Sequence, residues 1–242
     1  MSREICIEAS RVLEKAYLAY KAYLPARATD TLERFPVYLF ATEKGYLAYS
    51  KGVTGTMPMR SAGLYSPVLR QLLIWNLPRR IAMMQTVRHE GLHQYIDRVM
   101  PSPARWFNEG HAEYFEAART KGSWRLGLVR RDHIKTLGLS PKMSLEAFMN
   151  QSAYVFLRNA RFNYAFSWLL VHYLHHGNPK NKAILKSLFQ NYIAGKAHAQ
   201  VWEIATKNIN MLAFESGLWQ HFKKLGGVHQ PRPKPKNGRY GQ

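Results

Sequence analysis

The chain has little cysteine, little negative charge and no long apolar run. Among its 242 residues Cys6 is the one cysteine, so neither an intrachain disulfide nor a cluster of thiolate metal ligands can form. Any metal site must therefore use histidine and carboxylate ligands. No apolar run approaches the roughly 20 residues that a membrane-spanning helix needs, so we expect no transmembrane segment.

Acidic residues are outnumbered by basic ones. The sequence has 15 Asp and Glu against 35 Lys and Arg, which gives a formal net charge of +20. Such a surface is attracted to polyanions such as nucleic acid, anionic lipid or acidic substrates. The charge is spread along the chain and is densest at its end, so it fits either a basic surface without a specific partner or non-specific contact with an anionic surface.

The first residues do not have the pattern of a secretion signal. The segment Met1-Ser2-Arg3-Glu4 carries an acid early and leads into an amphipathic stretch. We therefore expect a cytoplasmic protein, or a secreted or periplasmic one if a leader has been removed.

Hydrophobic periodicity predicts one domain over 1–226 with a sheet near its start and helices after it. A basic, disordered tail is predicted over 227–242, because this segment is rich in proline, glycine and cations. Predicted strands cover 36–40, 62–65 and 71–75, and a loop covers 50–63. Predicted helices cover 2–24, 43–49, 79–99, 106–119, 144–150, 161–176, 179–194, 198–206 and 210–225, with a short hairpin at 121–130.

The segment His89-Glu90-Gly91-Leu92-His93 lies in the middle of a predicted helix. Residues four apart share one helix face, so both imidazoles can reach a single ion. Glu90 lies about a hundred degrees around the helix from His89, where it can reach a water near that ion without binding the ion itself. This arrangement is typical of zinc hydrolases.

A catalytic zinc usually takes three protein ligands and leaves one position open. The segment 106–115 offers a third ligand, Glu109, at the start of the next predicted helix. The prolines in 100–103 should end the first helix. If the second helix packs back on the first, it brings the Glu109 carboxylate to the histidine pair.

Over about 62–119 the sequence resembles the gluzincin metallopeptidases, and its wider setting is similar to compact peptidase MA-like proteins of uncharacterised function. The resemblance rests on the histidine–glutamate helix and on the phrase Asn-Glu-Gly-His-Ala-Glu at 108–113. It implies an α+β fold of the thermolysin-like (zincin) type, with a small N-terminal mixed sheet, an active-site helix and a mainly helical C-terminal half.

The resemblance also implies roles for single residues. His89, His93 and Glu109 become ligands of Zn²⁺, and Glu90 becomes the general base that activates water. Glu113, one turn after Glu109, becomes a carboxylate that orients a ligand histidine through its distal nitrogen.

For a donor that stabilises the oxyanion, the resemblance points to a tyrosine on a later helix, and Tyr164 is the choice. His133 is a weaker candidate for this role. His111 is expected to face solvent or support the ligands, because a neighbour two residues from Glu109 points away from the ion.

Two further patterns support separate expectations. His172, His175 and His176 have no adjacent carboxylate, and we interpret them as the charged C-terminal end of a helix. The strand predicted at 71–75 lies just before the histidine helix, which suggests that an extended substrate pairs with it.

The sequence therefore predicts a zinc-dependent metallopeptidase that acts on a peptide or protein substrate, with endopeptidase and exopeptidase action both open. The alternative is a basic protein that binds nucleic acid or another anionic surface and whose zinc site is structural or vestigial.

Overall fold

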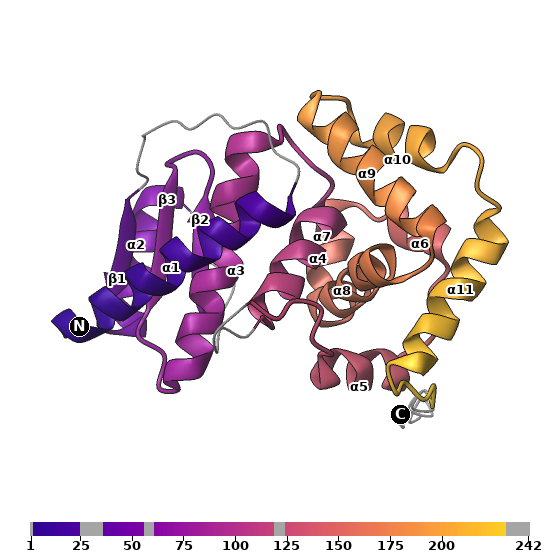
Figure 1. Ribbon diagram of the computed structural model, residues 1–242. Coiled ribbons are helices and arrows are strands. Elements are labelled where there is room, and N and C mark those ends of the chain that lie inside the picture. Colours follow the sequence, from indigo (N-terminus) through magenta and orange to yellow (C-terminus); the bar gives the residue numbers. More distant parts are fainter. Residues whose placement is uncertain (1, 25–35, 56–60, 119–123, 231–242) are drawn as a thin grey trace, which may run out of the picture.

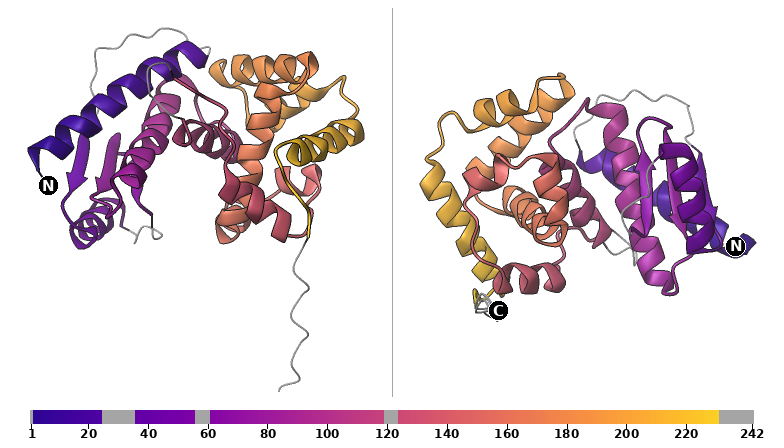
Figure 2. Two further views of the ribbon diagram at one scale, coloured as in Figure 1. Left: turned by 60° about the horizontal axis from the view of Figure 1, so that its bottom comes forward. Right: turned by 180° about the vertical axis from the view of Figure 1, so that it is seen from behind.

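The structure of the protein, a computed structural model, describes residues 2–24, 36–55, 61–118 and 124–230. An N-terminal part built on a three-stranded sheet packs against a C-terminal part made of helices (Figure 1, Figure 2). This confirms the predicted α+β class. No helix in the described ranges is long and apolar enough to cross a membrane.

The N-terminal part has helices on both faces of the sheet (Figure 1). Its elements are α1 (Arg3–Tyr23), β1 (Val37–Phe40), α2 (Glu43–Thr54), β2 (Gly63–Ser66), β3 (Gln71–Trp75) and α3 (Arg80–Val99). The C-terminal part contains α4 (Arg105–Glu116), α5 (Arg131–Leu139), α6 (Leu145–Met149), α7 (Ala153–Arg158), α8 (Ala160–His176), α9 (Pro179–Ile193), α10 (His198–Thr206) and α11 (Met211–Lys224).

β3 is the central strand of the sheet, parallel to β1 and antiparallel to β2. Leu72 and Ile74 point to one face, where they pack with Ala9 of α1 and Val87 of α3. Because both edges of β3 are paired, the hypothesis that a substrate pairs with this strand is wrong. Among the described strands, β1 and β2 form the outer edges of the sheet.

Most predicted elements are present, with differences at the turns. The loop predicted at 50–63 begins later, since α2 runs on to Thr54 and ends at Gly55, whose φ of 71° suits a glycine after a helix. The predicted hairpin is wrong over 124–130, where the described chain has no paired strand beyond an isolated bridge; 119–123 lie outside the described residues. The short helices α5 and α7 were not predicted.

α8 forms the centre of the C-terminal part. Its apolar residues cover the whole circumference of the helix, a pattern typical of a buried helix. Phe166, Trp168, Leu169 and Leu170 are fully buried there. Helices α4, α5, α7, α9 and α11 pack around it.

After α11 the chain folds back onto α5. The backbone N–H of Gln230 donates to the carbonyl oxygen of Gly138 at 2.8 Å. The first residues of the predicted tail, 227–230, are thus held against the domain, and 231–242 lie outside the described residues.

Candidate metal centre

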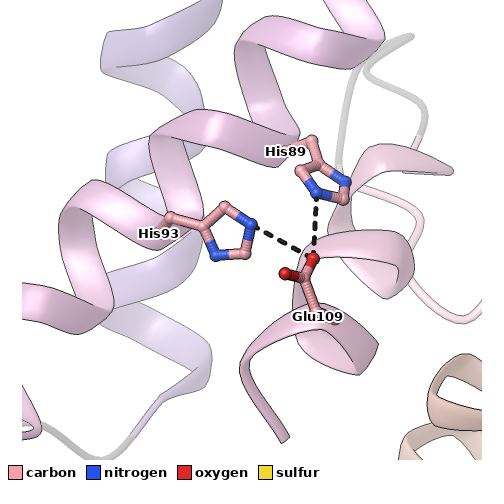
Figure 3. Close-up of side chains that lie close together, drawn as sticks. All are labelled: His89, His93 and Glu109. Carbon is pink, nitrogen blue, oxygen red and sulfur yellow. Dashed lines mark ion pairs between the residues drawn. The ribbon is translucent and has the colours of Figure 1, made fainter. Parts of the chain in front are cut away.

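The histidine pair and Glu109 come together where α3 packs against α4. His89 and His93 lie one turn apart on α3 and point at Glu109 on α4 (Figure 3). His89 Nε2 is 3.5 Å and His93 Nε2 is 3.4 Å from the same atom, Glu109 Oε2. His89 and Glu109 are buried, and His93 is partly buried.

These separations fit a small divalent cation. With zinc bonds of about 2.0–2.2 Å to nitrogen and oxygen, a nitrogen–oxygen separation of 3.4 to 3.5 Å corresponds to an angle of about 110° at the ion, close to tetrahedral. Glu109 Oε2 is also buried without a hydrogen-bond partner among the described residues. A buried carboxylate oxygen without a partner destabilises the folded protein unless a cation or a proton binds to it. The three side chains therefore suit a zinc-type ion.

Backbone packing holds Glu109 in this position. Pro101 and Pro103 follow the end of α3, and the chain re-enters a helix at Arg105. At Gly110 an added Cβ would lie 2.5 Å from the carbonyl oxygen of Ser167, so glycine is required for α4 to cross α8 this closely. The close crossing fixes the neighbouring Glu109 relative to α3.

The second nitrogen of each histidine has an oxygen partner. His89 Nδ1 lies 3.0 Å from Glu116 Oε2, and His93 Nδ1 lies 2.9 Å from Asn108 Oδ1. With Nδ1–H donating to each oxygen, Nε2 of each ring carries the lone pair that a metal needs.

The partner of His89 differs from the predicted one. Glu113 Oε1 lies 3.9 Å from His89 Nδ1, beyond hydrogen-bond distance, and Glu116 occupies the orienting position instead. Both carboxylates are on the same side of α4. The spacing of Glu113 and Glu116 in the sequence therefore could not show which of them would bond His89.

Glu113 has partners of its own. Its Oε2 lies 2.8 Å from His133 Nε2 and 2.9 Å from Arg130 Nη1, and the same nitrogen lies 3.0 Å from Glu116 Oε1. His89, Glu113 and Glu116 form a second group with the spacing of metal ligands. A guanidinium already lies against its two carboxylates, so the group with Glu109 is the better metal site.

The electrostatics of the site favour positive charge between the three side chains. Burial lowers the pKa of His89, but the carboxylates of Glu109 and Glu116 outweigh this and hold that pKa well above its ordinary value. Burial likewise lowers the pKa of His93, and Glu109 again raises it on balance. Burial raises the pKa of Glu109, yet His93 and His89 hold that pKa far below its usual range.

Glu90 lies at the free edge of β2. Its Oε2 accepts the backbone N–H of Tyr65 at 2.8 Å. Trp75 N–H bonds to the Ala62 carbonyl, so Gly63 and Tyr65 are the residues of β2 whose backbone groups point away from β3. One oxygen of Glu90 is thus fixed by the sheet.

Tyr164 of α8 also lies near the site. Its ring centroid is 6.5 Å from that of His89, and the two planes differ by 23°. Burial, followed by the charges of Glu109 and Glu90, raises the pKa of Tyr164, so its hydroxyl stays protonated. His133, the weaker candidate for an oxyanion donor, is hydrogen-bonded to Glu113.

Four other histidines, His111, His172, His175 and His221, lie in or beside the helical core. His111 is fully buried, with Nδ1 2.7 Å from the Phe107 carbonyl oxygen, and does not face solvent. His172 Nδ1 lies 2.8 Å from His221 Nε2, and burial lowers the pKa of each of these two histidines to about 4. Burial also lowers the pKa of His175. His175 and His176 do lie in the last turn of α8, as expected, but burial lowers the pKa of both and disfavours the positive charge expected there.

The chain is similar over residues 83–192 to a family of proteins of unknown function, DUF1570. The matched residues run from α3 to α9 and include the histidine pair, Glu109, Arg130 and Tyr164. No curated protein matches the chain. The histidine pair and Glu109 therefore lie inside the matched segment. Because the function of the family is unknown, the match indicates no activity.

Proposed function

We propose that this protein is a zinc-dependent metallopeptidase of the gluzincin type, with a zincin-like arrangement of sheet, α3 and α4. The observation that carries the proposal is the convergence of His89 Nε2 and His93 Nε2 on the unpartnered, buried Glu109 Oε2. Two imidazoles and one carboxylate are the ligand set of many catalytic zinc sites.

His89, His93 and Glu109 would hold the zinc ion, which would supply Lewis acidity to polarise a carbonyl group and to lower the pKa of a water molecule to about 7. Glu90 takes the proton of the attacking water and later delivers it to the leaving amine. Its Oε2 is held by the N–H of Tyr65. Oε1 remains for the water.

Tyr164 donates its hydroxyl proton in a hydrogen bond to the developing oxyanion. Its raised pKa keeps the proton on the hydroxyl at the pH of the reaction. Its ring lies beside that of His89.

The substrate binds as an extended strand along the free edge of β2. The backbone groups of Gly63 point toward that edge, next to the Tyr65 N–H that holds Glu90. Pairing by main-chain hydrogen bonds places a peptide carbonyl near the ligands without requiring a particular side chain.

The decisive experiment compares zinc-loaded wild-type protein with Glu90→Gln on a peptide library of mixed sequence, with cleavage followed by mass spectrometry. Glu90→Gln keeps the size of the side chain and the three ligands, so it is expected to bind zinc normally and to lose activity by roughly 100-fold or more. Glu43→Gln, an exposed carboxylate on α2, is the control. Absence of cleavage by the zinc-loaded wild type, or cleavage by Glu90→Gln at the wild-type rate, refutes the proposal.

A second candidate function, binding to nucleic acid or another anionic surface, is favoured by the distribution of charge. Twenty of the 35 Lys and Arg follow residue 117, but only four of the 15 Asp and Glu do. If this candidate is correct, the protein binds duplex DNA of mixed sequence with an affinity that falls steeply with salt and does not depend on zinc. Lack of DNA binding at low salt excludes this second function.

A further inference from the structure

Arg130 connects the segment that precedes α5 to the carboxylates behind the metal centre. Its side chain is 15% exposed, and Nη1 lies 2.9 Å from Glu113 Oε2 and 3.0 Å from Glu116 Oε1. Nη2 lies 2.8 Å from Asp132 Oδ2. One guanidinium therefore bridges two largely buried carboxylates of α4 and one exposed carboxylate of α5.

The carboxylates of α4 depend on this cation. Glu113 and Glu116 are three residues apart on the same helix, a spacing at which like charges repel. Glu116 is also the last residue of α4, and helix ends fray. Its Oε2 must nevertheless stay 3.0 Å from His89 Nδ1 if it is to fix that ring.

We propose that Arg130 is a positioning residue of the metal centre, which holds the Glu116 carboxylate against His89 and thereby sets the affinity of the site for zinc. The inference rests on the zinc site proposed above. A lysine cannot replace Arg130 fully, because its ammonium group lacks the planar fork that bonds Asp132 through Nε and Nη2 and so aims Nη1 at both Glu113 and Glu116.

The competing interpretation is an ion pair that only ties residues 124–130 to α4. Such a pair stabilises the folded chain to the same extent with and without metal, and its loss leaves the zinc affinity of the folded protein unchanged. A positioning residue changes that affinity, because a misplaced Glu116 lets the His89 ring rotate away from the ion. The affinity of the folded protein for zinc therefore distinguishes a positioning residue from a purely structural ion pair.

The test measures the Zn²⁺ affinity of the full chain by competition with a chromophoric chelator, and the absorption spectrum of the Co²⁺-loaded protein. Arg130→Met is expected to weaken Zn²⁺ binding by about 10- to 100-fold and to shift the Co²⁺ bands. Arg130→Lys should have an intermediate effect. Arg131→Met, which removes the next, exposed cation, is the matched control and should bind Zn²⁺ like the wild type.

Coupling between Arg130 and Glu116 is tested with Glu116→Gln and the double variant. If Arg130 acts through Glu116, Arg130→Met adds no further loss of affinity to Glu116→Gln. If the double variant loses affinity by the product of the two single losses, the inference is wrong. It is also wrong if folded Arg130→Met binds Zn²⁺ like the wild type. Where Arg130→Met does not fold, Arg130→Lys is used for this comparison. Failure of the wild-type chain to bind Zn²⁺ is a different result, and it refutes the metal centre itself.

Discussion

At the scale of single residues, the candidate centre depends on hydrogen bonds that leave each histidine with one free nitrogen. Glu116 and Asn108 accept from the Nδ1 atoms of His89 and His93. Nε2 of each ring then points at Glu109 Oε2. Under the proposed function, neither ring would need to turn before an ion binds.

Replacement of Glu116 by glutamine tests whether the hydrogen bond to His89 Nδ1 matters for metal binding. The amide keeps an acceptor oxygen but loses the charge that strengthens the His89 imidazole as a ligand and pairs with Arg130. We expect Zn²⁺ affinity to fall by about 10- to 100-fold, measured by chelator competition. Glu146→Gln, an exposed carboxylate on α6, is the control.

Glu113→Gln shows whether the effect on zinc binding is specific to Glu116. Its carboxylate is 3.9 Å from His89 Nδ1 and bonds His133 instead. Its loss should therefore weaken zinc binding less than the loss of Glu116. A larger effect of Glu113→Gln would show that the order of the two carboxylates in solution is the reverse of the one described.

The shared face of His89 and His93 was predictable from sequence, because helical periodicity decides which side chains of one helix lie together. The place of Glu109 was expected from the family resemblance and required α4 to pack back on α3. The contact of Glu116 with His89 was not predictable, since it depends on how α4 is rotated against α3. Arg130 was missed for a related reason. It reaches α4 only because the chain folds back before α5, a path that no local pattern specifies.

At the scale of elements, the site depends on how closely β2 approaches α3. A Cβ at Gly63 would lie 2.8 Å from Thr86 Cγ2, 3.0 Å from the Leu73 carbonyl oxygen and 3.1 Å from Glu90 Cγ. Glycine therefore permits the contact between Tyr65 and Glu90. The metal ligands are not part of this contact.

Gly63→Ala should separate catalysis from metal binding. The added methyl group pushes β2 away from α3 and releases Glu90, so kcat/KM should fall by roughly 10- to 100-fold. Zn²⁺ affinity should change by less than about twofold, since the variant alters no ligand and no ligand partner. Peptide hydrolysis and chelator competition on the same preparation measure the two quantities.

Gly52→Ala is the control at this scale, because its Cβ would meet nothing within 4 Å. It lies inside α2, where alanine should stabilise the protein by up to about 1 kcal/mol. Equal activity of wild type and Gly63→Ala would mean that the fixed position of Glu90 is not required.

The elements themselves were largely predictable, and their pairing was not. Alternating and helical patterns located the strands and the long helices. The order of the strands depends on contacts between distant segments, so the central position of β3 could not be inferred from its place just before α3. α2 was predicted too short because residues 50–63 are rich in glycine, serine, threonine and methionine, whereas the helix ends at Gly55.

At the scale of the whole molecule, a network of neutral histidines makes the C-terminal part sensitive to acid. Burial lowers the pKa of both His172 and His221 to about 4, with help from His176 and, for His221, Lys224. The unfolded chain has histidine pKa values near 6.5. A group with a lowered pKa in the folded state stabilises the protein above the unfolded value, and this stability is lost as pH falls toward the folded value.

We therefore expect the free energy of unfolding to decrease between about pH 6.5 and pH 4 by on the order of 3 kcal/mol for each of these two histidines. His221→Gln keeps a donor for His172 and removes one titrating group, so its stability should fall less over the same range. Urea unfolding of metal-free protein at several pH values measures the difference. Parallel losses in wild type and variant would exclude the network as the cause.

The central claim is that His89, His93 and Glu109 hold one metal ion between the sheet and the helical part. The most direct test is anomalous diffraction at the zinc edge from crystals of the zinc-loaded chain. We predict one peak per chain, within about 2.2 Å of both histidine Nε2 atoms and of a Glu109 oxygen. A peak bound by Glu113 and Glu116 instead, or no peak at this junction, would contradict the account.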